Sequence, residues 1–340
     1  MKNITDRPLV HITEETGLPL FGHTAFGIRT YGTNLIEVRP LTGCQLRCPH
    51  CYVAEGLRSE TRTTDYIIDD LKYIQKTVDF VAEHLGRKRL EVHLSAQGEL
   101  LLHPQIVEII MSLNEIQGIE TISMQTNGAN LSEQLLVDME YAGLDRINLS
   151  LNSLNPERAI LLAGTRNYDL EHVLQMIQYI ADSSIDLLLA PVLVPGINDE
   201  DIPQIIHYAR TIPNERHFPR LGIQKYLTYR LGRRFRDIKP WSWEKFQQHI
   251  SSLERKTGYK PLLLTPQSFG IHPRRQLPIP FRVREKITVQ ITHPGRVNGE
   301  YIASLRNRAI QVINAQAQIG TNIRVQIIRT RGNIIVAKPI

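Results

Sequence analysis

Three cysteines are the residues of this sequence best suited to chemistry. Cys44, Cys48 and Cys51 are spaced C-x3-C-x2-C, and the chain has 3 cysteines in all. An odd number of cysteines packed this closely is not a disulfide framework. Thiolates at this spacing can bind a structural zinc ion, with His50 or His93 as fourth ligand, or an iron–sulfur cluster. Three thiolates leave one iron of a [4Fe–4S] cluster open to the amine and carboxylate of a small molecule.

The segments that must position these cysteines alternate between strands and helices. Hydrophobic alternation predicts strands over 34–40, 89–95, 121–125, 146–151, 185–194 and 221–227. Helical periodicity predicts helices over 64–85, 105–116, 132–141, 169–180, 201–211 and 243–256. Such alternation indicates an α/β fold with parallel strands and helices outside. Because the polar candidates follow strands, we prefer an open, partial (β/α)6 barrel to a doubly wound sheet.

The cysteine segment, Cys44-Gln-Leu-Arg-Cys48-Pro-His-Cys51-Tyr52, resembles the signature of the radical SAM superfamily. The resemblance runs from about residue 34 to about residue 258 and includes archaeal members described as Fe–S oxidoreductases. It implies that the three cysteines hold a single [4Fe–4S] cluster and that S-adenosylmethionine is the second cofactor. An electron donor such as ferredoxin or flavodoxin then drives cleavage of S-adenosylmethionine to a 5′-deoxyadenosyl radical. This chemistry implies a reducing, cytoplasmic location.

Further segments match the family at positions that contact S-adenosylmethionine. Gly98-Glu99 matches the motif that binds the methionine amine, although Gln97 replaces its first glycine. A carboxylate and a backbone edge suit an ammonium group. Structural hydrogen bonds are the alternative role for the strand residues, and a solvent-facing loop is the alternative for Glu99. The residues that the resemblance assigns to the cofactor are His50, Gly98, Glu99, Thr126, Asn127, Ser150, Asn152 and Val192.

The cysteine count restricts the reaction class that the resemblance allows. Radical methylthiotransferases, SPASM-type peptide maturases and the enzymes that open molybdopterin synthesis bind a second cluster through further cysteines. RNA methylases with a methyl-carrying cysteine pair and epimerases with a thiol hydrogen donor also need cysteines that this chain lacks. The reactions that remain are a rearrangement, an isomerisation, a ring closure or a radical addition. No catalytic residue is assigned.

Charge is distributed unevenly along the chain. The whole sequence has a net charge of +6, whereas residues 284–340 alone carry nine basic and two acidic residues, a net charge of +7. Short β-type stretches over 286–293, 299–305, 309–312, 322–328 and 333–338 predict a small all-β barrel of the OB type there. This barrel resembles a TRAM domain, an RNA-binding module. The charge asymmetry suggests an acidic polymer as partner.

A second basic segment, residues 216–239, interleaves arginines with aromatic residues. Basic side chains mixed with aromatics suit the binding of a single-stranded nucleic acid. A solvated basic surface without a ligand is the alternative for both segments. The residues predicted to contact RNA are Arg230, Arg233, Arg234, Arg236, Arg296, Arg306, Arg308, Arg324, Arg329 and Arg331.

These observations predict four regions and one leading function. The regions are an N-terminal extension (1–33), a radical SAM core (34–260), a linker (261–283) and the TRAM/OB-like basic domain (284–340). No apolar run approaches the ~20 residues of a membrane span, and we expect no membrane partner. We predict a radical SAM enzyme that modifies RNA, with tRNA favoured. The alternatives are an enzyme acting on a peptide or small metabolite, and a non-catalytic, metal-containing RNA-binding protein.

Overall fold

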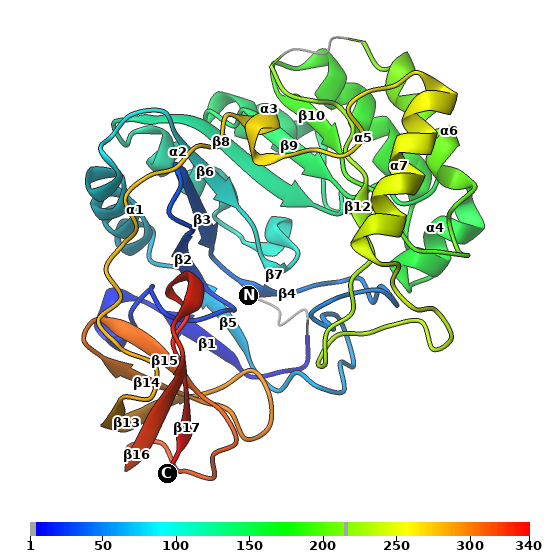
Figure 1. The fold of residues 1–340 in the computed structure, drawn as a ribbon. Coiled ribbons are helices and arrows are strands. Elements are labelled where there is room, and N and C mark those ends of the chain that lie inside the picture. The colour runs from blue at the N-terminus through cyan, green and yellow to red at the C-terminus, as the bar shows by residue number, and fades with distance from the viewer. Residues whose placement is uncertain (1–4, 214–216) are drawn as a thin grey trace. The chain divides into compact units, whose positions relative to one another are not determined.

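The computed structural model describes residues 5–213 and 217–340 (Figure 1). Arg216, at the start of the predicted basic segment, therefore lies outside the described residues. The chain divides into two compact units. The first unit comprises Met1–Gly43, Arg58–Ile122 and Pro273–Ile340, and the second comprises Cys44–Leu57 and Ser123–His272. The residues predicted to surround the cofactor are divided between the two.

The first unit contains the N-terminal part of the α/β core. Strand β3 pairs in antiparallel register with β2 and in parallel register with β6, and β1 pairs in parallel with β5. The predicted strand at 34–40 and the predicted helix at 105–116 are confirmed. The elements are β1 (Leu9–Ile12), β2 (Gly27–Thr30), β3 (Leu35–Arg39), β4 (Thr42–Gly43), β5 (Asp65–Ile68), α1 (Leu71–Leu85), β6 (Leu90–Leu94), β7 (Gln97–Gly98) and α2 (Ile106–Asn114).

The helix predicted over 64–85 begins later than the sequence pattern suggested. Asp65–Ile68 is strand β5, which pairs with β1 of the N-terminal segment. Helix α1 then begins at Leu71, because the carboxylate of Asp70 caps it by accepting a hydrogen bond from the backbone of Tyr73. The N-terminal segment therefore contributes strands to the core.

The second unit continues the alternation of parallel strands and helices. Strand β9 pairs in parallel with β10 and with β8 (Ile119–Thr126), whose last residues belong to this unit. The elements that follow β8 are α3 (Glu133–Tyr141), β9 (Arg146–Leu149), α4 (Pro156–Ala163), α5 (Leu170–Asp182), β10 (Asp186–Leu189), β11 (Val192–Leu193), α6 (Asp201–Thr211), β12 (Gln224–Lys225) and α7 (Trp243–Thr257). Among the described helices, none is both long and apolar enough to cross a membrane.

Two predicted strands of this unit are shorter than the sequence suggested, and one helix was missed. The stretch 185–194 separates into β10 and β11 around Pro191, which has no backbone N–H for a sheet ladder. The stretch 221–227 is regular only over the two residues of β12. Helix α4 went unpredicted although Asn155 caps it and Pro156 occupies its first turn.

The C-terminal segment forms the predicted small barrel (Figure 1). Its five strands close in the order β13-β14-β15-β17-β16, with β15 and β17 parallel. The strands are β13 (Lys286–Pro294), β14 (Tyr301–Leu305), β15 (Arg308–Val312), β16 (Asn322–Arg329) and β17 (Val336–Pro339). Inward-facing apolar side chains fill the barrel, including Phe281, Val289, Ile291, Ile310, Val325 and Ile335.

The barrel is bonded to the N-terminal segment of its own unit. The backbone N–H of Ala309 donates to the carbonyl of Phe21 (2.7 Å), and that of Ile335 donates to the carbonyl of Gly22 (2.8 Å). A Cβ on Gly22 would lie 2.1 Å from the carbonyl oxygen of Ala309, so only glycine permits this approach. The buried Tyr66 hydroxyl donates to Pro294 (2.7 Å). These contacts explain why the barrel belongs to the first unit.

Candidate functional site

The cysteine loop belongs to the second unit, and its three thiols form no disulfide. Cys44 is buried, whereas Cys48 and Cys51 are partly exposed. Two backbone N–H groups point at these sulfur atoms: that of Leu46 lies 3.3 Å from Cys44 Sγ, and that of Glu55 lies 3.4 Å from Cys51 Sγ. Hydrogen bonds of this kind stabilise thiolates and tune the potential of an iron–sulfur cluster.

The donor set of this loop fits a [4Fe–4S] cluster. Within the described residues, no three His, Cys, Asp or Glu side chains converge on a point that would hold one metal ion. A cluster does not require such convergence, because each thiolate binds a different iron. Cys44, Cys48 and Cys51 would therefore hold the cluster, and the backbone N–H groups would support it. With S-adenosylmethionine bound, the cluster supplies a one-electron reductive cleavage.

The Gly98-Glu99 motif lies in the first unit, beside the residue that precedes Cys44. Strand β7 pairs in parallel with β4, and the backbone N–H of Glu99 donates to the carbonyl of Gly43 (2.8 Å). A Cβ on Gly98 would lie 1.8 Å from that carbonyl oxygen, which explains why glycine occupies the position. The Glu99 side chain is buried and accepts a hydrogen bond from the backbone of Leu101 (3.1 Å). It is therefore held in a fixed orientation and does not face solvent.

The turn that follows β8 contacts the cysteine loop within the second unit. The amide oxygen of Asn127 accepts hydrogen bonds from Ala129 (3.0 Å) and from the side chain of Gln45 (3.2 Å). Its amide nitrogen lies 3.8 Å from Cys44 Sγ. The Thr126 hydroxyl accepts from the next turn residue, Gly128 (3.0 Å). The predicted pair thus shapes the turn, and Asn127 also reaches a cluster ligand.

Three further predicted residues of this unit, Ser150, Asn152 and Val192, are hydrogen-bonded at the strand ends. The Ser150 hydroxyl accepts from Gln125 (3.0 Å), and the Asn152 side chain accepts from the backbone of Val192 (2.8 Å). Asn198 joins this set by donating to the carbonyls of Asn152 and Val192, each at 2.9 Å. Asn198 is fully buried. It is not among the residues predicted from the sequence, although its position shortly after the Pro195–Gly196 turn could have indicated a role at the strand end.

His50 is partly exposed, but its Nδ1 atom is buried. Burial, followed by the nearby positive charge of Arg233, lowers the pKa of His50 to about 4. The imidazole is therefore neutral at pH 7. Within the described chain, Nδ1 has no hydrogen-bond partner.

The arginines of the basic segment in the second unit differ in their exposure and in their contacts. Arg233 is partly buried and donates from Nε to the carbonyl of Cys48 (2.8 Å). It also donates to the carbonyl of Glu55. Arg230, Arg234 and Arg236 are exposed. The structure thus removes Arg233 from the set predicted to contact RNA, because its guanidinium is engaged with the cysteine loop.

The arginines of the barrel also differ in exposure, and two of the predictions are corrected. Arg296 is buried, with its guanidinium 3.7 Å from Asp65. Arg308 is buried, stacks over Phe21 and donates to a carbonyl of the linker, so neither side chain is available to RNA. Arg306 is exposed and is paired with Glu285 at 2.8 Å, so it stays in the predicted set. The remaining predicted residues of the barrel are exposed: Arg324, Arg329 and Arg331.

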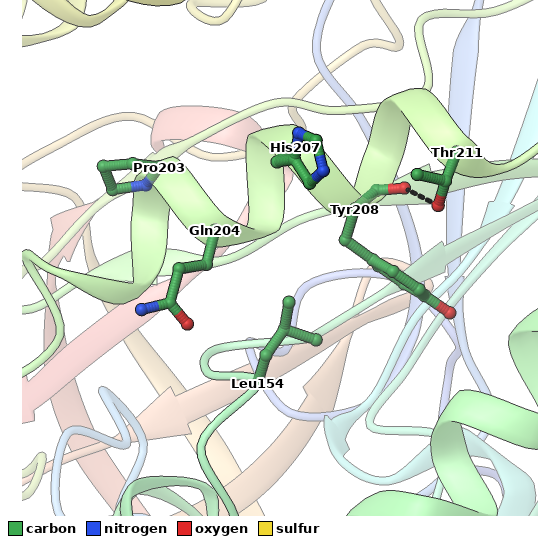
Figure 2. A pocket seen from close by; sticks show the side chains of 6 residues that line it. All are labelled: Leu154, Pro203, Gln204, His207, Tyr208 and Thr211. Atoms are coloured by element: carbon green, nitrogen blue, oxygen red, sulfur yellow. Dashed lines mark hydrogen bonds between the residues drawn. The ribbon is translucent and has the colours of Figure 1, made fainter.

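A pocket lies on helix α6 of the second unit. It has a volume of about 470 Å³ and is open to solvent. Figure 2 shows the side chains that line it: Leu154, Pro203, Gln204, His207, Tyr208 and Thr211. None of them is a predicted site residue, so this pocket is separate from the candidate site.

Comparison with known proteins identifies the family of this chain. The radical SAM superfamily pattern matches residues 38–209, which include the cysteine loop and the turn after β8. An uncharacterized protein of Methanocaldococcus jannaschii is 40% identical over 355 residues, covering 98% of this chain and 81% of the relative. The chain therefore belongs to the radical SAM superfamily.

Two more distant similarities describe the core. GTP 3′,8-cyclase of Peptoclostridium acidaminophilum is 30% identical over 223 residues, covering 65% of this chain and 62% of that enzyme. The structure of HydG, a maturase of the [FeFe]-hydrogenase, matches with a TM-score of 0.51 at 14% identity, covering 69% of this chain and 52% of that one. The predicted α/β partial barrel with a C-terminal β-barrel is confirmed. The protein is a radical SAM enzyme, and its family uses a [4Fe–4S] cluster, S-adenosylmethionine and a reductant.

Proposed function

We propose that this radical SAM enzyme modifies RNA, with tRNA as the favoured substrate, and that its TRAM-like barrel binds the RNA. The proposal includes ferredoxin or flavodoxin as the electron donor and a reducing, cytoplasmic location. Gly98 and Glu99 would bind the methionine end of S-adenosylmethionine. His50, the turn at Thr126 and Asn127, and the set around Ser150, Asn152 and Val192 would orient its nucleoside.

The observation that carries the RNA proposal is a basic face on the barrel. Lys286 and Lys338 both lie opposite Gln326, in one row across β13, β16 and β17. Arg324 lies two residues from Gln326 on β16, so its side chain points to the same face. Lys286, Arg324 and Lys338 are all exposed. A basic face of this kind binds the phosphates of a nucleic acid without recognising particular bases.

The two acidic residues of the barrel do not offset this charge. Glu300 is buried, where it accepts a hydrogen bond from Gln311 (2.8 Å) and lies 3.8 Å from His23. Glu285 is paired with Arg306. The exposed charge of the barrel is therefore strongly positive, and it is concentrated on the strands that carry the basic face.

Salt-dependent binding of tRNA to the full-length protein tests this proposal. Because phosphate contacts release counterions, affinity should fall steeply with salt. Replacing Arg324 and Lys338 with Gln should weaken binding to all sequences and reduce the slope of log K against log salt by about 1.4 to 1.8. Arg306→Gln removes one charge that is already paired with Glu285, and should change the slope little. An absence of tRNA binding at low salt would contradict the proposal.

A small metabolite is the second candidate substrate. Polar side chains are buried on one face of β3 and just after β6, where Arg39 and Ser95 both donate hydrogen bonds to Glu37. Glu37 and Arg39 alternate with the apolar Ile36 and Val38, so they share one face of the strand. The similarity to GTP 3′,8-cyclase also supports a small substrate. Cleavage of S-adenosylmethionine that is stimulated by metabolite extracts, and not by RNA, would favour this candidate.

A further inference from the structure

The irregular arm after β12, residues 229–236, returns to the cysteine loop of its own unit. The backbone N–H of Arg233 donates to the carbonyl of Cys51 (2.8 Å), and its Nε donates to the carbonyl of Cys48 (2.8 Å). Its Nη2 donates to the carbonyl of Glu55. One residue thus binds three carbonyls, two of which belong to cluster ligands.

The sequence of the arm permits its close approach to the cysteine loop. A Cβ on Gly232 would lie 2.5 Å from the carbonyl oxygen of Tyr52, so only glycine lets the arm come this close. On the other side of Arg233, the backbone of Phe235 donates to the hydroxyl of Tyr226 (3.3 Å). Tyr226 is buried in an apolar cluster with Leu162 and Val194, against which Phe235 packs. The arm is therefore fixed at both ends of the arginine.

Glu55 connects Arg233 to one of the groups that face the sulfur atoms. Glu55 donates its backbone N–H to Cys51 Sγ, while its carbonyl is held by Arg233. Arg233 therefore holds the loop at the carbonyl of Glu55, one peptide group beyond the N–H group that faces Cys51 Sγ. An arginine serves here because its planar fork can bind two carbonyls at once, and it remains charged at all accessible pH values.

We propose that Arg233 is a positioning residue of the cluster loop, which fixes the peptide groups around the cysteines and eases one-electron reduction of the cluster by its positive charge. Reduction adds a negative charge to the cluster, and a fixed cation nearby stabilises that added charge. Oriented N–H···S hydrogen bonds act in the same direction. The proposal depends on the cluster of the radical SAM family and is independent of whether the substrate is RNA.

The midpoint potential of the anaerobically reconstituted, full-length protein tests this role. Arg233→Gln removes the charge, and we expect the ratio of reduced to oxidised cluster at a fixed potential to fall about tenfold. This corresponds to a midpoint potential about 59 mV more negative for a one-electron couple. Arg233→Lys keeps the charge but cannot reach both carbonyls, so it should recover part of the shift. Arg234→Gln is the matched control, because it removes an exposed arginine from the same arm and should leave the potential unchanged.

Equal potentials in wild type, Arg233→Gln and Arg234→Gln, with equal iron content, would overturn the proposal. A shift of the same size in both variants would also overturn it, because it would reflect only the net charge of the arm. If Arg233→Gln binds no cluster, amide hydrogen exchange of the cluster-free proteins decides. Faster exchange confined to residues 48–56 supports the proposal, and unchanged exchange there contradicts it.

Discussion

The contribution of Glu37 to the stability of the first unit should depend on pH, and this dependence tests the structure quantitatively. The Glu37 carboxylate lies 2.7 Å from Arg39 and 3.3 Å from Arg29, and it accepts a hydrogen bond from Ser95 (2.8 Å). Its side chain is 10% exposed, so solvent screens these interactions little. Burial alone would raise the pKa of Glu37, but the two arginines and the hydrogen bonds outweigh it and lower the pKa to about 2.

The stabilisation follows from the difference between the folded and unfolded pKa values. The ordinary pKa is 4.5 and the folded pKa is about 2, which at about 1.4 kcal/mol per pH unit corresponds to about 3 kcal/mol. Because the folded pKa is the lower one, this contribution is present in full above pH 4.5. It is lost as the pH falls from 4.5 through 2, when the carboxylate takes up a proton in the folded state.

Glu37→Gln isolates this contribution, because glutamine resembles the protonated side chain. At pH 7 the variant should be about 3 kcal/mol less stable than wild type, and below pH 2 the two should be nearly equal. Denaturant unfolding of the cluster-free proteins, followed by circular dichroism between pH 7 and pH 2, measures both. A difference that stays constant across this range would refute the ion-pair account of Glu37.

Three further predictions concern the cofactor site. Cys48→Ala should abolish the cluster, so that the iron content falls from about four atoms per chain to near zero by metal analysis. Glu99→Gln removes one charge-assisted hydrogen bond of about 1.5–3 kcal/mol, so it should weaken the binding of S-adenosylmethionine about 10- to 150-fold. Calorimetry measures this affinity, and the iron content should stay unchanged. An unchanged affinity would contradict the assignment of Glu99. Gly98→Ala should prevent cluster assembly, because its Cβ would lie 1.8 Å from Gly43, whereas Gly86→Ala, also at positive φ but in open space, should assemble a normal cluster.

Local patterns in the sequence predicted the elements that carry the site. The strand before the cysteine loop, the turn at Asn127 and the five strands of the barrel all have short-range signals, either alternating polarity or turn residues. The family signature then identified the role of the cysteines. These features depend on neighbours within a few residues, which is why a single sequence is enough to find them.

The features that the sequence did not predict depend on contacts between distant residues. Arg233 was assigned to RNA because it stands in a basic segment, yet it binds carbonyls about 180 residues earlier in the chain. Arg296 and Arg308 add to the charge count but are buried, Arg296 beside Asp65 of β5 and Arg308 over Phe21 of the N-terminal segment. The sequence pattern predicts helix where strand β5 lies, because the strand that pairs with it, β1, is more than fifty residues away in the sequence. Charge counts and hydrophobic periodicity contain no information on which side chains are buried or on which distant strands pair.

Mass spectrometry of RNA nucleosides tests the central proposal most directly. RNA from cells that lack this gene would be compared with RNA from the same cells carrying the wild-type gene or the Cys48→Ala variant. We predict a nucleoside that is present with the wild-type gene and absent both without it and with the variant. Identical nucleoside profiles in all three, from a strain in which the wild-type protein holds its cluster and cleaves S-adenosylmethionine, would contradict RNA as the substrate.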